Sequence, residues 1–239
     1  MDEATRDSTN DWNARIRPAG DRAMLITLDD PRPVQRLASA LRVHAIAGVQ
    51  DVLPAAETVL VTMHSVSYGV QVRRELVALL DRLDQEPPQP DSPDVSRGTL
   101  PDSEFPDDVV EIPVRYDGAD LPEVADLLGL SVPEVIAAHT GTVWRCAFVG
   151  FAPGFGYLTS PDGRLSVPRR AQARTAIPPG AVALAGGYSA VYPRGTPGGW
   201  QLIGNTDLRM WVVDRDPPAL VRAGTAVRFV DTAADGDKA

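Results

Sequence analysis

Cysteine and histidine are scarce in this chain of 239 residues, which has one cysteine and three histidines. A single cysteine, Cys146, excludes an internal disulfide and is compatible with a reducing compartment. Because it lies in an apolar, strand-like run, we expect a buried, inert thiol rather than a nucleophile. His44 and His64 fall in the first part of the chain, away from His139, so no histidine-based metal site is expected.

Positive charge and long apolar runs are lacking as well. Lys and Arg number 23 against 32 Asp and Glu, which gives a net charge of -9. Proteins that bind nucleic acid usually carry a basic surface, and anionic lipid attracts polybasic segments, so neither partner is expected. No window approaches 18 uninterrupted apolar residues, and the first ten residues carry no apolar signal core. The chain is therefore predicted to be cytoplasmic.

Several well-known catalytic motifs are also absent. The sequence has no Gly-Lys-Ser/Thr phosphate loop, no dinucleotide-binding fingerprint and no His-Glu-x-x-His zinc helix. The segment 187–191 starts like the nucleophile elbow of a serine hydrolase, but it lacks the closing glycine and no helix follows it. These absences argue against a self-contained nucleotide-binding enzyme, a zinc protease and a serine hydrolase.

The first part of the chain instead shows strands and helices in alternation. Period-2 runs predict strands over 13–18, 23–28, 49–53 and 58–63. Apolar residues at helical spacing predict helices over 34–45, with Gly48 as its C-terminal cap, and over 72–83. The order ββαββα predicts an α+β domain of ferredoxin-like type over residues 13–86.

A segment rich in proline and acidic residues follows over 87–108 and is predicted to be a linker. The second domain, 109–232, begins with a strand over 109–114. Two short helices are predicted next, over 121–128, ended by Gly129, and over 132–139, capped by Ser131. The later strands are predicted over 142–149, 181–184, 189–192, 201–203, 208–213 and 226–230. Short strands at such regular spacing predict a closed β-barrel or a sandwich.

The segment from Phe148 to Thr206 stands out within this second domain. It holds 11 of the 20 glycines of the chain and five arginines, but only one acidic residue, Asp162. Glycine and proline favour shaped, stiff loops. Guanidinium groups present a planar fork of donors to carboxylate or phosphate. The segment therefore predicts a binding site for a small anion.

Each candidate residue of this site also has a purely structural interpretation. His139 is either a site residue or a helix C-terminal cap. Arg169 and Arg174 either contact an anion or are solvated, whereas Arg170 and Arg194 are expected to be solvated. The turn 196–200 either offers backbone N–H groups to an anion or is only a tight turn. The aromatic residues beside glycines are either pocket walls or core residues: Phe151, Phe155, Tyr157 and Trp200.

Taken together, the motifs resemble the family of 5-oxoprolinase B subunits, also known as allophanate hydrolase subunit 1 and as KipI-like kinase inhibitors. The resemblance rests on five segments of this sequence: His139-Thr-Gly141, Gly150-Phe-Ala-Pro-Gly-Phe-Gly-Tyr-Leu158, Pro168-Arg169 with Arg174, Ile177-Pro-Pro-Gly180, and Tyr192-Pro through Thr196-Pro-Gly-Gly-Trp200 to Thr206. Two positions depart from the family pattern. Gly187-Tyr188 replaces a frequent Glu-Gln, and Asn205 replaces a common arginine.

The resemblance implies a cyclophilin-like β-barrel behind the small α+β domain, and a role as one component of a complex. Its partners would be proteins like the C and A subunits of 5-oxoprolinase, with ATP as co-substrate in the opening of 5-oxoproline to glutamate. The alternatives that the family offers are inhibition of a histidine kinase and membership of a carboxyltransferase or urea-type amidohydrolase.

For the site, the resulting hypothesis names His139, Arg169 and Arg174 as catalytic residues. The substrate-binding residues are predicted to be Phe155, Tyr157, Thr196, Gly198, Gly199, Trp200, Asn205 and Thr206.

Overall fold

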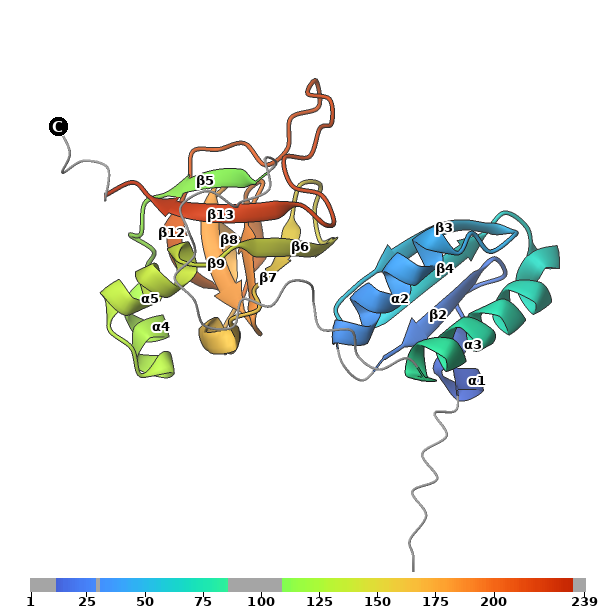
Figure 1. Ribbon diagram of the computed structural model, residues 1–239. Coiled ribbons are helices and arrows are strands. Elements are labelled where there is room, and N and C mark those ends of the chain that lie inside the picture. The colour runs from blue at the N-terminus through green and yellow to red at the C-terminus, as the bar shows by residue number, and fades with distance from the viewer. Residues whose placement is uncertain (1–11, 29–30, 86–108, 234–239) are drawn as a thin grey trace, which may run out of the picture. The chain divides into compact units, whose positions relative to one another are not determined.

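The computed structural model describes residues 12–28, 31–85 and 109–233 (Figure 1). The chain divides into two compact units, 1–100 and 101–239, and each is described here by itself. The linker predicted over 87–108 lies outside the described residues. In the part of the chain that is described, no helix is long and apolar enough to cross a membrane.

The first unit is a four-stranded antiparallel sheet with two helices packed on one face (Figure 1). The strand order is β1-β2-β4-β3. The strands are β1 (Ile16–Pro18), β2 (Ala23–Thr27), β3 (Val49–Pro54) and β4 (Thr58–Met63), and the helices are α2 (Pro31–Val43), the 3₁₀ turn η1 (Val66–Tyr68) and α3 (Gly69–Gln85). The predicted ββαββα order is therefore confirmed.

Two local predictions in this unit were wrong. A short helix, α1 (Trp12–Arg15), precedes β1 where a longer strand was predicted. The buried Trp12 ring donates its Nε1–H to Asp84 Oδ2 at 2.9 Å, which ties α1 to α3. Gly48 does not cap α2, which ends at Val43. Gly48 has a φ of +92° and packs against the ring of Tyr68, where a side chain would not fit.

The second unit is built on a seven-stranded sheet that curls into a nearly closed barrel. Its order is β12-β9-β10-β7-β6-β13-β5. A single bridge between Arg115 and Asn205 joins the two edge strands. The strands are β5 (Val110–Val114), β6 (Trp144–Val149), β7 (Gly156–Thr159), β9 (Ala181–Ala185), β10 (Tyr188–Val191), β12 (Gln201–Asn205) and β13 (Ala226–Asp231). A separate ribbon pairs β8 (Arg174–Ile177) with β11 (Thr196–Gly198).

Two helices and one 3₁₀ turn complete the unit: α4 (Leu121–Leu128), α5 (Val132–Thr140) and η2 (Gly163–Leu165). Both predicted helix boundaries are confirmed. Gly129 adopts the left-handed conformation with a φ of 65° and closes α4. The hydroxyl of Ser131 accepts from the backbone N–H of Glu134, whose carboxylate accepts from the N–H of Ser131, so the pair forms a capping box.

The strand predicted over 208–213 does not form. The segment instead belongs to a loop with one isolated bridge, between Trp211 and Ala219. The guanidinium group of Arg215 donates to the carbonyl oxygens of Arg209, Met210, Pro217 and Pro218. These bonds satisfy main-chain acceptors that a sheet neighbour would otherwise take.

Strand β9 separates two apolar clusters of the second unit, because its residues alternate between the two faces of the sheet. Val182 and Leu184 point into the barrel interior, with Trp144 and Phe229. Ala181, Ala183 and Ala185 face a second cluster that contains Phe155, Tyr192 and Trp200. All five residues of β9 are buried.

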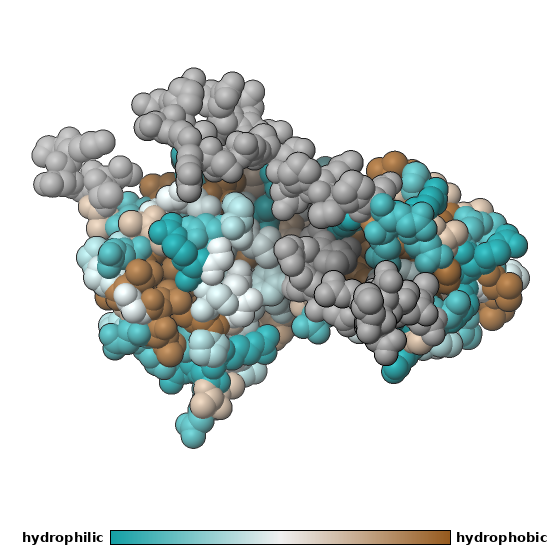
Figure 2. All heavy atoms as spheres, turned by 60° about the horizontal axis from the view of Figure 1, so that its bottom comes forward, coloured by the Kyte–Doolittle hydropathy of each residue, from teal (hydrophilic) through white to brown (hydrophobic). Residues whose placement is uncertain are grey.

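Cys146 is also buried in the barrel interior, and burial raises the pKa of its thiol to about 12. This confirms the predicted inert thiol. At the surface, apolar residues interrupt the hydrophilic ones in places (Figure 2). The exposed large apolar side chains of the second unit are Leu127, Val149, Phe151, Trp211 and Val213.

Candidate functional site

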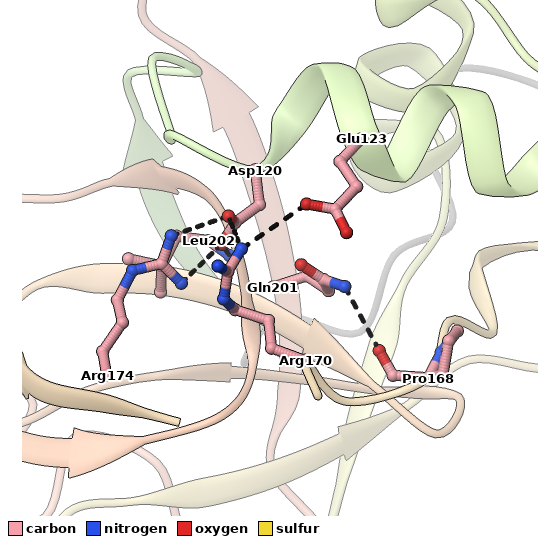
Figure 3. A network of polar contacts seen from close by, with 7 residues as sticks. All are labelled: Asp120, Glu123, Pro168, Arg170, Arg174, Gln201 and Leu202. Carbon is pink, nitrogen blue, oxygen red and sulfur yellow. Dashed lines mark hydrogen bonds and ion pairs between the residues drawn. The ribbon is translucent and has the colours of Figure 1, made fainter. Parts of the chain in front are cut away.

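A buried carboxylate, Asp120, binds the guanidinium groups of two arginines, Arg170 and Arg174, in the second unit (Figure 3). Asp120 is 2% exposed. Its oxygens accept from Arg174 Nη1 at 2.8 Å and Nη2 at 2.7 Å, and from Arg170 Nη1 at 2.5 Å. The backbone N–H of Leu202 donates a further bond of 2.7 Å. Asp120 precedes α4 as its N-cap residue but makes no side-chain cap bond, which leaves both oxygens for the arginines.

These contacts fix the charge state of the network. Burial works to raise the pKa of Asp120, but the hydrogen bonds from Arg174 and Leu202 and the charges of both arginines together lower it. Asp120 is therefore ionised at neutral pH. Two guanidinium groups around one buried carboxylate carry a formal charge of +1, and the exposed Glu123, 3.4 Å from Arg170 Nη1, brings the formal charge of the network to zero.

The structure corrects two predictions about these arginines. Arg174 was expected to lack a carboxylate neighbour, yet it forms a two-pronged ion pair with Asp120. Arg170 was expected to be solvated, yet its side chain is 28% exposed and is paired with the same carboxylate. Sequence distance explains the error, because Asp120 lies 50 and 54 residues from the two arginines.

Arg169 lies between two anchored residues. The carbonyl oxygen of Pro168 accepts from Gln201 Nε2 at 3.4 Å. On the other side, the backbone N–H of Arg170 donates to the carbonyl oxygen of Gly199 at 2.8 Å, and its side chain reaches Asp120. Arg169 itself is exposed, and its guanidinium group has no hydrogen bond or ion pair to any residue that the structure describes. The loop thus holds one cation free while its neighbours are fixed.

An aromatic floor, defined here as Phe155, Tyr157, Tyr192 and Trp200, covers the outer face of β9 and β10. Phe155 makes edge contacts with the other three rings at centroid distances of 5.0 to 5.5 Å. Tyr157 and Trp200 meet at 5.5 Å. Phe155 and Trp200 are buried, whereas Tyr157 is half-buried. The floor therefore combines core packing with partial exposure, and both interpretations of these aromatics apply.

The two tyrosine hydroxyls connect this floor to Arg169. Burial raises the pKa of Tyr157, and it raises the pKa of Tyr192 to about 12, while the charge of Arg169 acts in the opposite direction on both. A backbone hydrogen bond from Trp200 and the charge of Arg174 also act on Tyr192. Both phenols are neutral donors at physiological pH. Arg169 and the aromatic floor form one neighbourhood, because Pro168 and Arg170 are hydrogen-bonded to Gln201 and Gly199 on either side of Trp200.

His139 lies apart from this neighbourhood, in the barrel interior. It is fully buried, its Nδ1 is 2.7 Å from the hydroxyl of Tyr116 and its Nε2 is 2.8 Å from that of Ser189. Its ring stacks on Phe229 at 4.2 Å. Burial lowers the pKa of His139 to about 3, so the imidazole is neutral. With both ring nitrogens engaged and no solvent contact, these contacts give no support to a proton-shuttle role.

The segment 196–200 includes a paired strand rather than an isolated turn. Thr196 and Gly198 pair with Ile177 and Arg174 as strand β11, and the carbonyl oxygen of Gly199 accepts from Arg170. Gly198 packs against the hydroxyl of Tyr192, where an added Cβ would lie 2.5 Å from that oxygen. Strand pairing therefore uses main-chain groups that the prediction had assigned to an anion.

Asn205 and Thr206 lie at the other end of β12. The side chain of Asn205 accepts from Arg115 Nη2 at 2.5 Å and donates to Asp117, at the seam that closes the barrel. Thr206 is buried, and its N–H donates to the carbonyl oxygen of Gly180 at 2.9 Å. These contacts assign both residues to barrel closure, away from Arg169.

Sequence reasoning missed three residues of this region: Asp120, Tyr192 and Gln201. The only signal for Asp120 is its place directly before a predicted helix, where aspartate is a favoured cap residue. Gln201 is 1% exposed, and its Oε1 has no hydrogen-bond partner within the described residues.

Other kinds of site find less support. The described residues contain no group of His, Cys, Asp or Glu able to hold a metal ion. A cavity of 320 Å³ lies in the first unit, and its lining mixes charged and apolar side chains. Its residues are His44, Ala45, Ile46, Glu75, Ala78, Leu79 and Arg82. The arginine and aromatic region of the second unit is therefore the candidate site.

A nearly closed barrel that follows a small α/β unit in the sequence is a fold shared with solved structures of urea amidolyase and urea carboxylase. K. lactis urea amidolyase has this fold, with a TM-score of 0.63 over 92% of this chain and 15% of that chain at 17% identity. Residues 14–221 match the family described as carboxyltransferase domain, subdomain C and D. The chain belongs to this family, and the family resemblance drawn from the motifs is confirmed.

Two relatives are more similar in sequence. The 5-oxoprolinase B subunit of Escherichia coli O157:H7 is 46% identical over 138 residues, which cover 56% of this chain and 62% of that protein. The match thus spans less than two thirds of the relative. The crystal structure of TTHA0988 aligns at 33% identity with a TM-score of 0.64, over 88% of this chain and 40% of that chain.

Proposed function

We propose that this chain is the B subunit of a multi-subunit, ATP-dependent 5-oxoprolinase. The reaction converts 5-oxoproline, ATP and water to glutamate, ADP and phosphate. The similarity to a protein named as the B subunit of 5-oxoprolinase, at 46% identity, supports this assignment. The observation that carries it is Arg169, an exposed guanidinium group held between two anchored neighbours and beside an aromatic floor.

The chemistry requires an anion site of this kind. A lactam is unreactive until its oxygen is activated, for which phosphorylation by ATP is the natural route, and negative charge must then be stabilised as the ring opens. We assign Arg169 to the carboxylate of 5-oxoproline or to the phosphoryl group. The half-exposed hydroxyl of Tyr157 is a second donor. Arg170 and Arg174 act indirectly in this proposal. They bind Asp120, and this network fixes the loop that carries Arg169.

The site is proposed to be shared rather than complete. The sequence has no nucleotide-binding loop, so ATP is assigned to the complex as co-substrate. A protein like the C subunit of 5-oxoprolinase is the direct partner in this proposal, and one like the A subunit is the third component. The finer fold assignments, a ferredoxin-like first unit and a cyclophilin-like barrel, and the cytoplasmic location belong to the same proposal.

The direct test is Arg169→Ala in the reconstituted complex. Because a hydrogen bond to a charged group is worth about 1.5–3 kcal/mol, kcat/KM for 5-oxoproline is expected to fall roughly 10- to 150-fold. The free energy of unfolding is expected to change by no more than about 0.5 kcal/mol, since the side chain is exposed.

Arg194→Ala is the matched control, because Arg194 is an exposed arginine of the same segment. It should leave kcat/KM unchanged. If both variants lose kcat/KM equally, or if Arg169→Ala loses none, Arg169 is a solvated surface residue rather than a substrate contact. Turnover of 5-oxoproline by the purified chain alone would contradict the shared site.

A further inference from the structure

Phe151 adopts a backbone conformation that its side chain disfavours. Its φ is +66°, and among the described residues it is the one non-glycine with a positive φ. The other eight positive-φ residues described are glycines. In the left-handed region the Cβ atom crowds the main chain, so a bulky side chain is a steric outlier there. Glycine would occupy this position without strain.

The loop around Phe151 imposes this conformation. The N–H of Gly150 donates to the carbonyl oxygen of Phe155 at 3.1 Å, and the N–H of Phe155 donates to that of Ala152 at 2.9 Å. Gly154 packs against Trp211 so closely that an added Cβ would lie 2.9 Å from the Cβ of that residue. The turn is therefore over-determined, which is how a strained residue persists.

Core packing does not explain why a phenylalanine stands there. Its side chain is 59% exposed, so most of its apolar surface is not stabilised by burial within the chain. Its two ring contacts are edge-on, to Phe155 at 5.2 Å and to Tyr192 at 6.3 Å. These contacts orient the ring but leave most of it uncovered. Among the described residues, no further ring contact covers the exposed part of this side chain.

The position of the ring indicates what covers it. Phe151 borders the aromatic floor at Tyr192 and Phe155. Arg169 borders the same floor, because its neighbours Pro168 and Arg170 are hydrogen-bonded to Gln201 and Gly199, the residues on either side of Trp200. One exposed aromatic ring and one exposed, unpaired cation thus lie at the edge of the same aromatic floor. A ligand that contacts both needs an anionic group and an apolar body.

We propose that Phe151 is a substrate-contacting residue that forms the apolar wall of the Arg169 site, which therefore takes a small carboxylate with a compact carbon ring rather than a bare inorganic anion. This proposal rests on the proposed function and narrows it. Ring carbons that lie against Phe151 leave water, while the carboxylate meets the guanidinium group of Arg169. The strained backbone holds the wall in place before the ligand arrives.

The test separates stability from recognition, using Phe151→Gly and Phe151→Ala in the reconstituted complex. Glycine relieves the strain, so Phe151→Gly is expected to melt at the same temperature as the wild type or higher, and above Phe151→Ala. Both variants are nevertheless expected to raise KM for 5-oxoproline at least about fivefold, with KM for ATP unchanged. Val149→Ala, a nearby exposed apolar residue, should change neither constant.

A calorimetric titration keeps the proposal testable if the complex does not hydrolyse 5-oxoproline, an outcome that would end the proposed function alone. The wild-type complex should bind cyclopentanecarboxylate more tightly than acetate, and Phe151→Gly should lose that preference. If Phe151→Gly leaves this preference or the KM for 5-oxoproline unchanged, the proposal that Phe151 forms the apolar wall of the site is wrong. It is also wrong if the defect of Phe151→Ala is weaker association with the partner protein, because Phe151 would then be a contact between subunits.

Discussion

The two units of this chain fill their interiors with different chemistry. The first unit packs Ile26, Val61, Leu76 and similar side chains between a sheet and two helices, and its core is apolar throughout the described residues. The second unit buries polar groups as well. The buried polar or charged side chains in the described ranges all belong to it: Asp120, His139, Ser189, Gln201 and Thr206.

This difference indicates which of the two units carries the candidate site. An apolar core needs only volume and pattern, and it tolerates exchange of similar side chains. A buried carboxylate between two arginines is retained only where its charge has a use, because well-packed apolar residues would often be at least as stable. The second unit therefore carries the site, and its stability depends on charge and pH in ways that the first unit's does not.

The largest expected effect comes from Asp120→Ala. Removing the carboxylate leaves two partly buried guanidinium groups uncompensated, so the second unit should lose about 3–5 kcal/mol of unfolding free energy. Urea unfolding followed by hydrogen exchange would resolve the two units. The loss should appear only in amides of residues 109–233, together with a fall in 5-oxoprolinase activity.

Asp84→Ala is the matched change in the first unit, where it removes the hydrogen bond that Asp84 accepts from Trp12. A loss of about 1 kcal/mol is expected, confined to the first unit. Losses of similar size in the two variants would remove the distinction between an apolar and a charged interior.

An intermediate effect is expected from acid. Burial lowers the pKa of His139 to about 3, whereas an unfolded histidine has a pKa of about 6.5. Below pH 6.5 the imidazole of His139 is protonated in the unfolded chain but stays neutral in the folded unit. The free energy of unfolding therefore falls as the pH drops from 6.5 toward 3. The second unit should lose about 2 kcal/mol between pH 7 and pH 5.

Asp120 does not interfere, since its lowered pKa removes stability only below the ordinary carboxyl range. His139→Gln keeps a donor and an acceptor but cannot titrate. If its unfolding free energy falls as steeply with pH as that of the wild type, His139 is not the group responsible.

The smallest effect is expected at the capping box of α5. Ser131→Ala removes the acceptor for the backbone N–H of Glu134, and it should destabilise the second unit by about 1 kcal/mol. Thermal unfolding monitored by circular dichroism would detect this shift. Ser131→Asp should restore most of the stability, because aspartate also caps helices. Without such rescue, the loss would have to arise elsewhere than in the cap.

Prediction from the sequence worked where a pattern is local. The apolar stripes of α2 and α3 and the caps at Gly129 and Ser131 lie within a few residues of what they determine. Strands β7, β8 and β11 were not predicted, because three or four residues are too few to show an alternating pattern. Pairing across the sheet, which the sequence does not display, decides them.

The candidate site shows the same limit. The segment 148–206 was identified from its excess of arginine over acidic residues, and Arg169 retains the proposed role. The contacts of Arg174 and His139 could not be predicted, because their partners Asp120, Tyr116 and Ser189 lie 23 to 54 residues away. Composition located the region, but only the fold shows that Arg170 and Arg174 share a carboxylate while Arg169 does not.

The alternation along β9 has a consequence for packing on the two faces of the sheet. Methyl groups alone separate the main chain of β9 from the aromatic rings above it, at Ala181, Ala183 and Ala185. Valine at one of these positions would crowd the rings on this side of the sheet rather than Val182 or Leu184 on the other side. The two faces of one strand thus set the packing of the barrel interior and of the aromatic floor separately.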